Sequence, residues 1–206
     1  MDILENDGLL KREQGRGTFV ADNKINRELS GFLSVSEDLN RAGFNTDTKV
    51  IHYSIEEANK FSNISCKLGI SSSDELIKLK RLKSISGTPA ILIESYLPSK
   101  LFSSANLVGF EDSLYEYLKQ NEGIIPQSVD QTLEGVMPTK EEANLLNLVS
   151  NTPLLRVSGT TYDNKNREIE YFVGLYRADK IKFHLTINRE EEIKPSFFEA
   201  EKYCND

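Results

Sequence analysis

The chain has 206 residues, of which 38% are hydrophobic and 9% aromatic, and its formal net charge is −7. This composition suits one soluble domain with a sizeable core, and the acidic balance argues against a polyanion as the main partner of that domain. No apolar run is long enough for a membrane span, no signal peptide pattern opens the sequence, and its cysteines and histidines match no zinc spacing. We therefore expect a cytoplasmic protein with no cofactor, metal or membrane contact.

Residues 8–21, GLLKREQGRGTFVA, predict a short basic β-hairpin. The strands are expected at Leu9–Leu10 and Thr18–Val20, with Gly15–Gly17 as the turn. Glycine permits the tight turn, which directs Arg16 outward, and Arg12 adds a second cation on the first strand. Such a hairpin suits a DNA groove. A surface hairpin whose charges serve only solubility remains the alternative.

The rest of the chain alternates between strand and helix patterns after a polar linker at residues 22–29. A Thr-x-x-Glu capping box, Thr139 with Glu142, marks one helix start, and Ser36 is the expected N-cap of another. Residues 30–43 are expected to be a loop that enters a helix ending at Gly43, and further helices are predicted over 55–68, 113–121 and 139–148. Strands are predicted over 49–53, 76–85, 90–97, 131–136, 153–162, 169–177 and 181–187. The order predicts an α+β fold, an antiparallel sheet with flanking helices.

A faint internal repeat runs through this order. The tetrapeptide Glu-Glu-Ala-Asn occurs at residues 56–59 and again at 141–144, and each copy precedes a predicted hairpin. Two such halves can pair their hairpins into one sheet and leave a cleft between them. A chance match between charged helices is the alternative.

Strand alternation places Arg81 and Lys83 on one face of residues 76–85, among aliphatic side chains. Because burying an unpaired charge is costly, two cations on such a face predict the floor of an anion pocket. The alternative is a half-exposed strand whose cations reach solvent or nearby carboxylates.

Further polar residues lie where they can face a ligand. Glu170 and Tyr176 share a face of residues 169–177, with Gly174 leaving room between them, although they can also be a cross-strand pair on a wet face. Ser113, with Tyr115, opens a helix whose free amides attract an anion. The loop containing Ser34 and Ser36 offers the same chemistry. In both places the serine can instead be a plain helix cap.

Two resemblances join these observations. The segment ENDGLLKREQGRGTFVA resembles the end of the recognition helix and the wing of a GntR-type winged helix-turn-helix of the HutC branch. The body is similar to the UTRA effector domain that follows such a wing, in the stretches SGFLSVSEDL, KRLKSISGTPAILIESYLP, DSLYEYL, PTKEEANLL, TPLLRVSGTTYD and IEYFVGLYRADKIKF. This resemblance implies a chorismate lyase-like fold and a small effector such as a sugar phosphate. It also implies that the phosphate is held by Ser34, Ser36, Arg81, Lys83, Ser113 and Tyr115, and the sugar by Glu170 and Tyr176.

The chain departs from the resembled pattern at two positions. Ile93 stands where phosphosugar-binding members often have a carboxylate, and alternation sends the neighbouring Glu94 to the opposite face unless a bulge intervenes. Lys83 stands where Arg is common, which removes a bidentate contact.

The resemblance implies four segments: the helix end and wing (1–22), a linker (23–29), the UTRA domain (30–188) and an acidic tail (189–206). Only Met1–Asp7 precede the hairpin, too few for a recognition helix, so we expect operator DNA binding only if the full winged helix is present. We expect a ligand-sensing, homodimeric repressor that binds a small anionic effector and is not an enzyme. The alternatives are a lyase-like enzyme using Glu170 and Tyr176, and a dimerisation module without a ligand.

Overall fold

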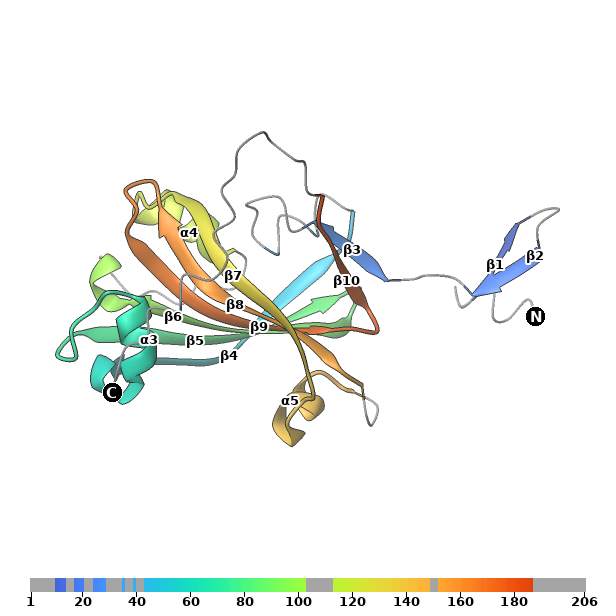
Figure 1. Cartoon of the computed structure of the whole chain (residues 1–206), viewed down its shortest axis with the longest axis horizontal. Helices are drawn as coiled ribbons and strands as arrows, with labels where there is room; N and C mark the ends of the chain where they lie inside the picture. Colours follow the sequence, from blue (N-terminus) through green and yellow to red (C-terminus); the bar gives the residue numbers. More distant parts are fainter. Residues whose placement is uncertain are drawn as a thin grey trace, which may run out of the picture.

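The computed structural model describes residues 10–13, 17–20, 24–28, 35, 39, 43–102, 113–148 and 152–186. Its centre is a six-stranded antiparallel sheet in the order β4-β5-β6-β9-β8-β7 (Figure 1). These strands are β4 (Thr46–Glu57), β5 (Glu75–Ile85), β6 (Thr88–Pro98), β7 (Pro126–Val136), β8 (Leu154–Asp163) and β9 (Glu168–Arg177). The helical elements are η1 (Ala58–Phe61), α3 (Ser62–Lys67), η2 (Ser99–Leu101), α4 (Leu114–Asn121) and α5 (Lys140–Leu145). The predicted α+β class is confirmed.

The sheet has the two-fold internal order that the repeat suggested. One half runs β4, η1 and α3, then the hairpin β5–β6, and the other runs β7, α5, then the hairpin β8–β9. The two hairpins meet at the β6–β9 pair, and β4 and β7 form the edges. Glu56 and Glu57 end β4, however, and do not open a helix. The helix predicted over 55–68 was wrong at its start, because β4 pairs with β5 as far as Glu57 opposite Glu75.

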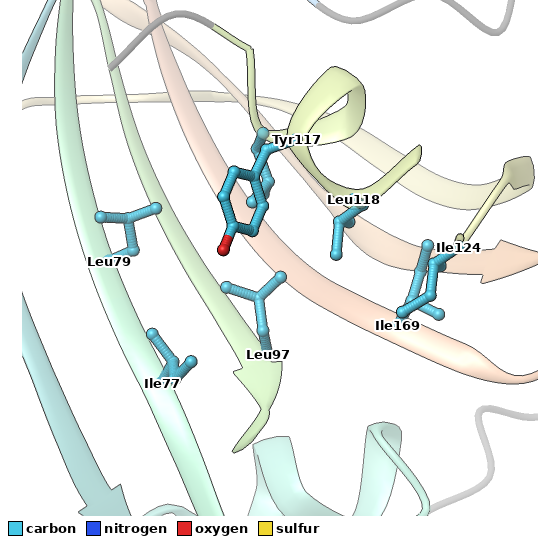
Figure 2. Packing of buried hydrophobic residues seen from close by; sticks show 8 residues of the cluster. Ile77, Leu79, Leu97, Tyr117, Leu118, Ile124 and Ile169 are labelled. Atoms are coloured by element: carbon cyan, nitrogen blue, oxygen red, sulfur yellow. The ribbon is translucent and has the colours of Figure 1, made fainter. Parts of the chain in front are cut away.

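Helices cover both faces of the sheet. Leu114 and Leu118 of α4 pack on one face, in a cluster with residues of β5 and β6 that is shown in Figure 2. On the opposite face, α3 packs over Leu76 and Tyr96, and α5 covers Leu92 and neighbouring aliphatic residues. Strand alternation therefore divides each central strand between two separate cores.

Turn chemistry fixes the two hairpins. Ser86 (φ 50°) and Gly87 (φ 78°) join β5 to β6 in a two-residue turn, which needs positive φ at both positions. The hairpin is as predicted, but the turn is shorter than the predicted residues 86–89, because β6 already begins at Thr88. Between β8 and β9, Asp163 Oδ1 accepts hydrogen bonds from the amides of Lys165 (2.8 Å) and Arg167 (2.9 Å). Burial raises the pKa of Asp163, but these bonds and the Arg167 guanidinium outweigh it and hold the pKa below its ordinary value.

The segment before the sheet differs from the prediction. Residues 25–28, predicted as part of a linker, form strand β3 (Ile25–Glu28), which pairs in parallel with β10 (Ile181–His184). The predicted basic hairpin is confirmed as β1 (Leu10–Glu13) and β2 (Gly17–Val20), with Arg12 in β1. Arg16 lies outside the described residues. Of the loop and helix predicted over 30–43, Val35 and Leu39 are helical, and most of the other residues lie outside the described ranges. No helix in the described ranges is both long and apolar enough to cross a membrane.

A buried polar cluster as the candidate functional site

The predicted site residues of the sheet lie on the face that α4 covers. Arg81 of β5 is opposite Ile93 of β6, which is opposite Gly174 of β9. In the next row, Lys83 is opposite Ile91, which is opposite Tyr176. Arg81 and Lys83 are 5% and 2% exposed, so the alternative of a half-exposed cationic strand is wrong.

Arg81 is buried with few partners. Its Nη2 donates a hydrogen bond to Ser95 Oγ at 3.0 Å. Among the described residues, its Nε–H has no hydrogen-bond partner and no carboxylate forms an ion pair with it. Burial lowers the pKa of the guanidinium, and the nearby Glu170, Tyr115 and Tyr176 partly oppose that shift. Buried polar groups are nearly always satisfied, so this donor requires an explanation.

Lys83 lies one row further along the same face. Its Nζ donates to Thr48 Oγ1 of β4 at 2.6 Å, and the two residues are directly opposite in the sheet. The Lys83 ammonium is thus held on the β4 side of its strand. Arg81 is its neighbour on β5, and Tyr176 lies in the same row two strands away.

Glu170 and Tyr115 form a compact hydrogen-bonded group with Thr161. The Tyr115 hydroxyl, carried by α4, donates to Glu170 Oε2 at 2.7 Å and lies 2.9 Å from Thr161 Oγ1. Thr161 is opposite Glu170, and the register shift there leaves Ile169 as an extra residue of β9. Burial and the neighbouring carboxyl group raise the pKa of the Tyr115 phenol well above its ordinary value. The phenol therefore stays a proton donor.

Tyr176 leans along its strand over Gly174. A Cβ on Gly174 would lie 2.9 Å from Cε2 and 3.3 Å from the hydroxyl of Tyr176. The absence of a side chain at Gly174 therefore makes room for the Tyr176 ring. The ring brings the hydroxyl into the row of Arg81 and Ile93. Arg27 of β3 donates a hydrogen bond to this hydroxyl.

The remaining predicted site residues have mixed outcomes. Ser113 caps α4, because its Oγ accepts a hydrogen bond from the Glu116 amide at 3.3 Å. Ser34 and Ser36 lie outside the described residues. Glu170 accepts hydrogen bonds from Tyr115 and Thr161, whereas Tyr176 accepts one from Arg27. Within the described part of the chain, the acid and phenol considered for an enzyme, Glu170 and Tyr176, are therefore not hydrogen-bonded to each other.

Glu94 lies on the opposite face, as alternation predicted. It forms an ion pair with Lys78 at 3.4 Å and accepts a hydrogen bond from the Tyr96 hydroxyl. Ile93 takes the position facing the cluster and is nearly fully buried. The floor between Arg81 and Tyr176 is therefore aliphatic.

Four members of the cluster were missed by sequence reasoning: Arg27, Thr48, Ser95 and Thr161. Ser95 interrupts the alternating apolar positions of its strand, and this pattern could have identified it. Arg27 gave no comparable signal, because most of the residues around it are polar.

Comparisons with known proteins agree with this architecture. The profile of the UTRA domain matches residues 41–182. The transcriptional repressor NagR of Bacillus subtilis is 29% identical over 180 residues, which are 87% of this chain and 73% of NagR. MngR of Escherichia coli, the repressor of a mannosyl-D-glycerate transport and metabolism system, is 26% identical over 181 residues, 88% of this chain and 75% of MngR.

Solved structures give the same result. The crystal structure of PhnF from Mycobacterium smegmatis has a TM-score of 0.75 and 25% identity, and the match covers 92% of this chain and 82% of PhnF. The effector domain of PhnF, at a TM-score of 0.72 and 23% identity, supports the fold alone. The chain therefore belongs to the UTRA domain family, among the GntR-type transcriptional regulators.

Proposed function

We propose that this chain senses a small anionic metabolite, with a sugar phosphate as the favoured candidate. The bound metabolite controls the DNA binding of a repressor. The observation that carries the proposal is Arg81. The residue is 5% exposed. Its guanidinium is positively charged and has an Nε–H without a partner among the described residues. An oxyanion would satisfy both its charge and its free donor.

The neighbouring groups support a ligand with hydroxyls as well as a charge. In the proposed assignment Arg81, Lys83, Ser113 and Tyr115, with Ser34 and Ser36, hold the phosphate, and Glu170 and Tyr176 face the sugar. Tyr115 interacts with both Arg81 and Glu170, so it connects the proposed phosphate-binding group with the proposed sugar-binding group. The aliphatic floor at Ile93 provides an apolar surface for the ring of a sugar.

The names of two relatives point in the same direction. MngR regulates a system for mannosyl-D-glycerate, a molecule with a sugar and a carboxylate, and both NagR and MngR are named repressors. For this chain we accordingly propose a non-enzymatic repressor that acts as a homodimer. We also propose that residues 1–22 contribute a wing, residues 30–188 the sensing domain and residues 189–206 a tail, with strand β3 in place of most of the predicted linker.

Thermal unfolding with a panel of compounds tests the proposal. Hexose phosphates, the matching neutral hexoses, inorganic phosphate and mannosyl-D-glycerate are titrated in a chloride buffer. A ligand that binds the folded state raises the melting temperature progressively with its concentration. We expect phosphorylated or carboxylated sugars to stabilise the chain and neutral hexoses to have little effect.

Matched variants locate the binding. Arg81→Met should abolish most of the ligand-induced shift. Arg156→Met is the control, because Arg156 is also a sheet arginine but pairs at the surface with Glu134 at 3.0 Å. Equal shifts in both variants would contradict the assignment of the anion to Arg81, and turnover of any stabilising compound would favour an enzyme.

A further inference from the structure

Tyr176 joins the buried cluster to the strand that follows the β1–β2 hairpin. Residues 21–24 separate β2 from β3, and β3 is held beside the sheet by its parallel pairing with β10. The only hydrogen bond that the Tyr176 side chain makes with described residues is the one that its hydroxyl accepts from Arg27 Nη1 of β3.

The Arg27 guanidinium is also held by rings. Its Cζ lies 5.2 Å from the centroid of the Tyr176 ring and 5.7 Å from that of Phe183, which is opposite Arg27 in the β3–β10 pair. Tyr176 and Phe183 pack edge to face with centroids 5.0 Å apart. One cation therefore connects β3, β9 and β10 through stacking and a hydrogen bond.

The hydrogen bond from Arg27 determines what Tyr176 can do for a ligand. Since the phenol oxygen accepts from a guanidinium, its own O–H is left to donate, and no described residue accepts it. Tyr176 is only 2% exposed. Within the described part of the chain, its hydroxyl and the Arg81 Nε–H are thus two buried donors without acceptors, on side chains that interact electrostatically with each other.

We infer that Arg27 is a positioning residue that makes Tyr176 a hydrogen-bond donor to an oxygen of the anionic effector, and that this contact couples effector binding to the docking of β3 on the sheet. This inference rests on the proposed function. An acceptor on the Tyr176 O–H strengthens the bond that the same oxygen accepts from Arg27, because hydrogen bonds in a chain polarise one another. Binding then tightens β3, and a tightened β3 favours binding, as linkage requires.

Hydrogen–deuterium exchange of the β3 and β10 amides tests the coupling in the full chain. The variants are Arg27→Met, Tyr176→Phe and the double variant, with Lys180→Met as control, because Lys180 is an exposed cation in the turn before β10. Without ligand, each of the two single variants should exchange about tenfold faster in β3, the double variant no faster than either, and the control like the parent.

The second measurement repeats the exchange with glucose-6-phosphate, fructose-6-phosphate and mannose-6-phosphate, each also titrated by thermal unfolding. In the parent, a sugar phosphate that stabilises the chain should slow exchange in β3 and β10. In Arg27→Met and Tyr176→Phe the slowing should disappear, while thermal stabilisation through Arg81 persists at a reduced level. Arg27→Lys should restore the charge but only part of the slowing, because an ammonium lacks the planar fork.

The outcomes separate the two proposals. Stabilisation of the parent without any change in β3 exchange would overturn the coupling and leave the proposed function standing. Additive effects of the two single variants on β3 exchange without ligand would also overturn it. No stabilisation by any phosphorylated sugar or by inorganic phosphate would overturn the proposed function, and this inference with it.

Discussion

Replacing Arg81 with Met should separate folding stability from anion binding. Among the described residues, the guanidinium makes one hydrogen bond, to Ser95 Oγ at 3.0 Å, and no ion pair. Removing a buried charge of this kind relieves a desolvation penalty of several kcal/mol. Against this gain, the Ser95 hydroxyl loses its partner inside the sheet, at a cost of about 1–3 kcal/mol. The Arg81→Met variant should therefore be as stable as the parent, or up to about 2 kcal/mol more stable.

The effect on ligand binding should have the opposite sign. Loss of a charge-assisted hydrogen bond to an oxyanion costs about 1.5–3 kcal/mol of binding free energy. This cost corresponds to a dissociation constant that is roughly 10- to 150-fold larger. A residue that costs stability in the empty protein and contributes affinity in the complex is typical of a binding site.

Urea unfolding in a chloride buffer free of phosphate and sulfate measures the first effect, and calorimetric titration of the stabilising sugar phosphate measures the second. The double variant Arg81→Met/Ser95→Ala should gain about 1 kcal/mol over Arg81→Met, because it removes the unsatisfied hydroxyl. If Arg81→Met is instead less stable than the parent by more than about 2 kcal/mol and still binds the sugar phosphate equally well, then Arg81 is a structural residue and the reasoning is refuted.

Three further substitutions test other parts of the structure. Tyr115→Phe removes the donor 2.7 Å from Glu170 and should cost about 2 kcal/mol in urea unfolding, so an unchanged midpoint would contradict a structural role for this bond. Thr139→Ala removes one side of the α5 capping box and should cost about 1 kcal/mol while the affinity for the sugar phosphate, measured by calorimetry, stays unchanged. Asp163→Asn should destabilise the chain at neutral pH. Because the folded-state pKa of Asp163 lies below its unfolded value, its stabilisation is complete above about pH 4 and is lost as the pH falls through the folded pKa. The difference between parent and variant in acid unfolding curves should therefore shrink toward low pH, and a constant difference would contradict the assignment.

The local sequence pattern was sufficient to predict the central hairpins and which residues share a face of each strand. The alternation in residues 76–85, followed by Ser86 and Gly87, predicts the β5–β6 hairpin because period two and a turn with positive φ agree. Local pattern was misleading at the start of the helix predicted over 55–68. Ile55, Ala58 and Phe61 have helical spacing, but pairing with β5 extends β4 to Glu57, and this long-range contact dominates over the local pattern.

The site shows the same division. Alternation correctly placed Arg81 with Lys83, and Glu170 with Tyr176, on one buried face. It could not predict which side chains meet across elements. The contact between Tyr115 and Glu170 depends on how α4 lies over β9, and the contact between Arg27 and Tyr176 joins residues 149 positions apart. Neither geometry has a local signal, since both depend on the packing of complete elements.

The near-mirrored order of the six strands has a consequence for how specificity can evolve in this chain. The two cations belong to the β4–β6 half, whereas Glu170 and Tyr176 belong to the β7–β9 half, and these groups face one another across the central β6–β9 seam. Substitutions in one half can tune the attraction for negative charge while those in the other change the fit to hydroxyl groups, and the electrostatic contacts of Arg81 with Glu170 and Tyr176 couple the two. If the halves descend from one ancestral segment, the recognition chemistry arose from their divergence, because neither half alone holds both kinds of group.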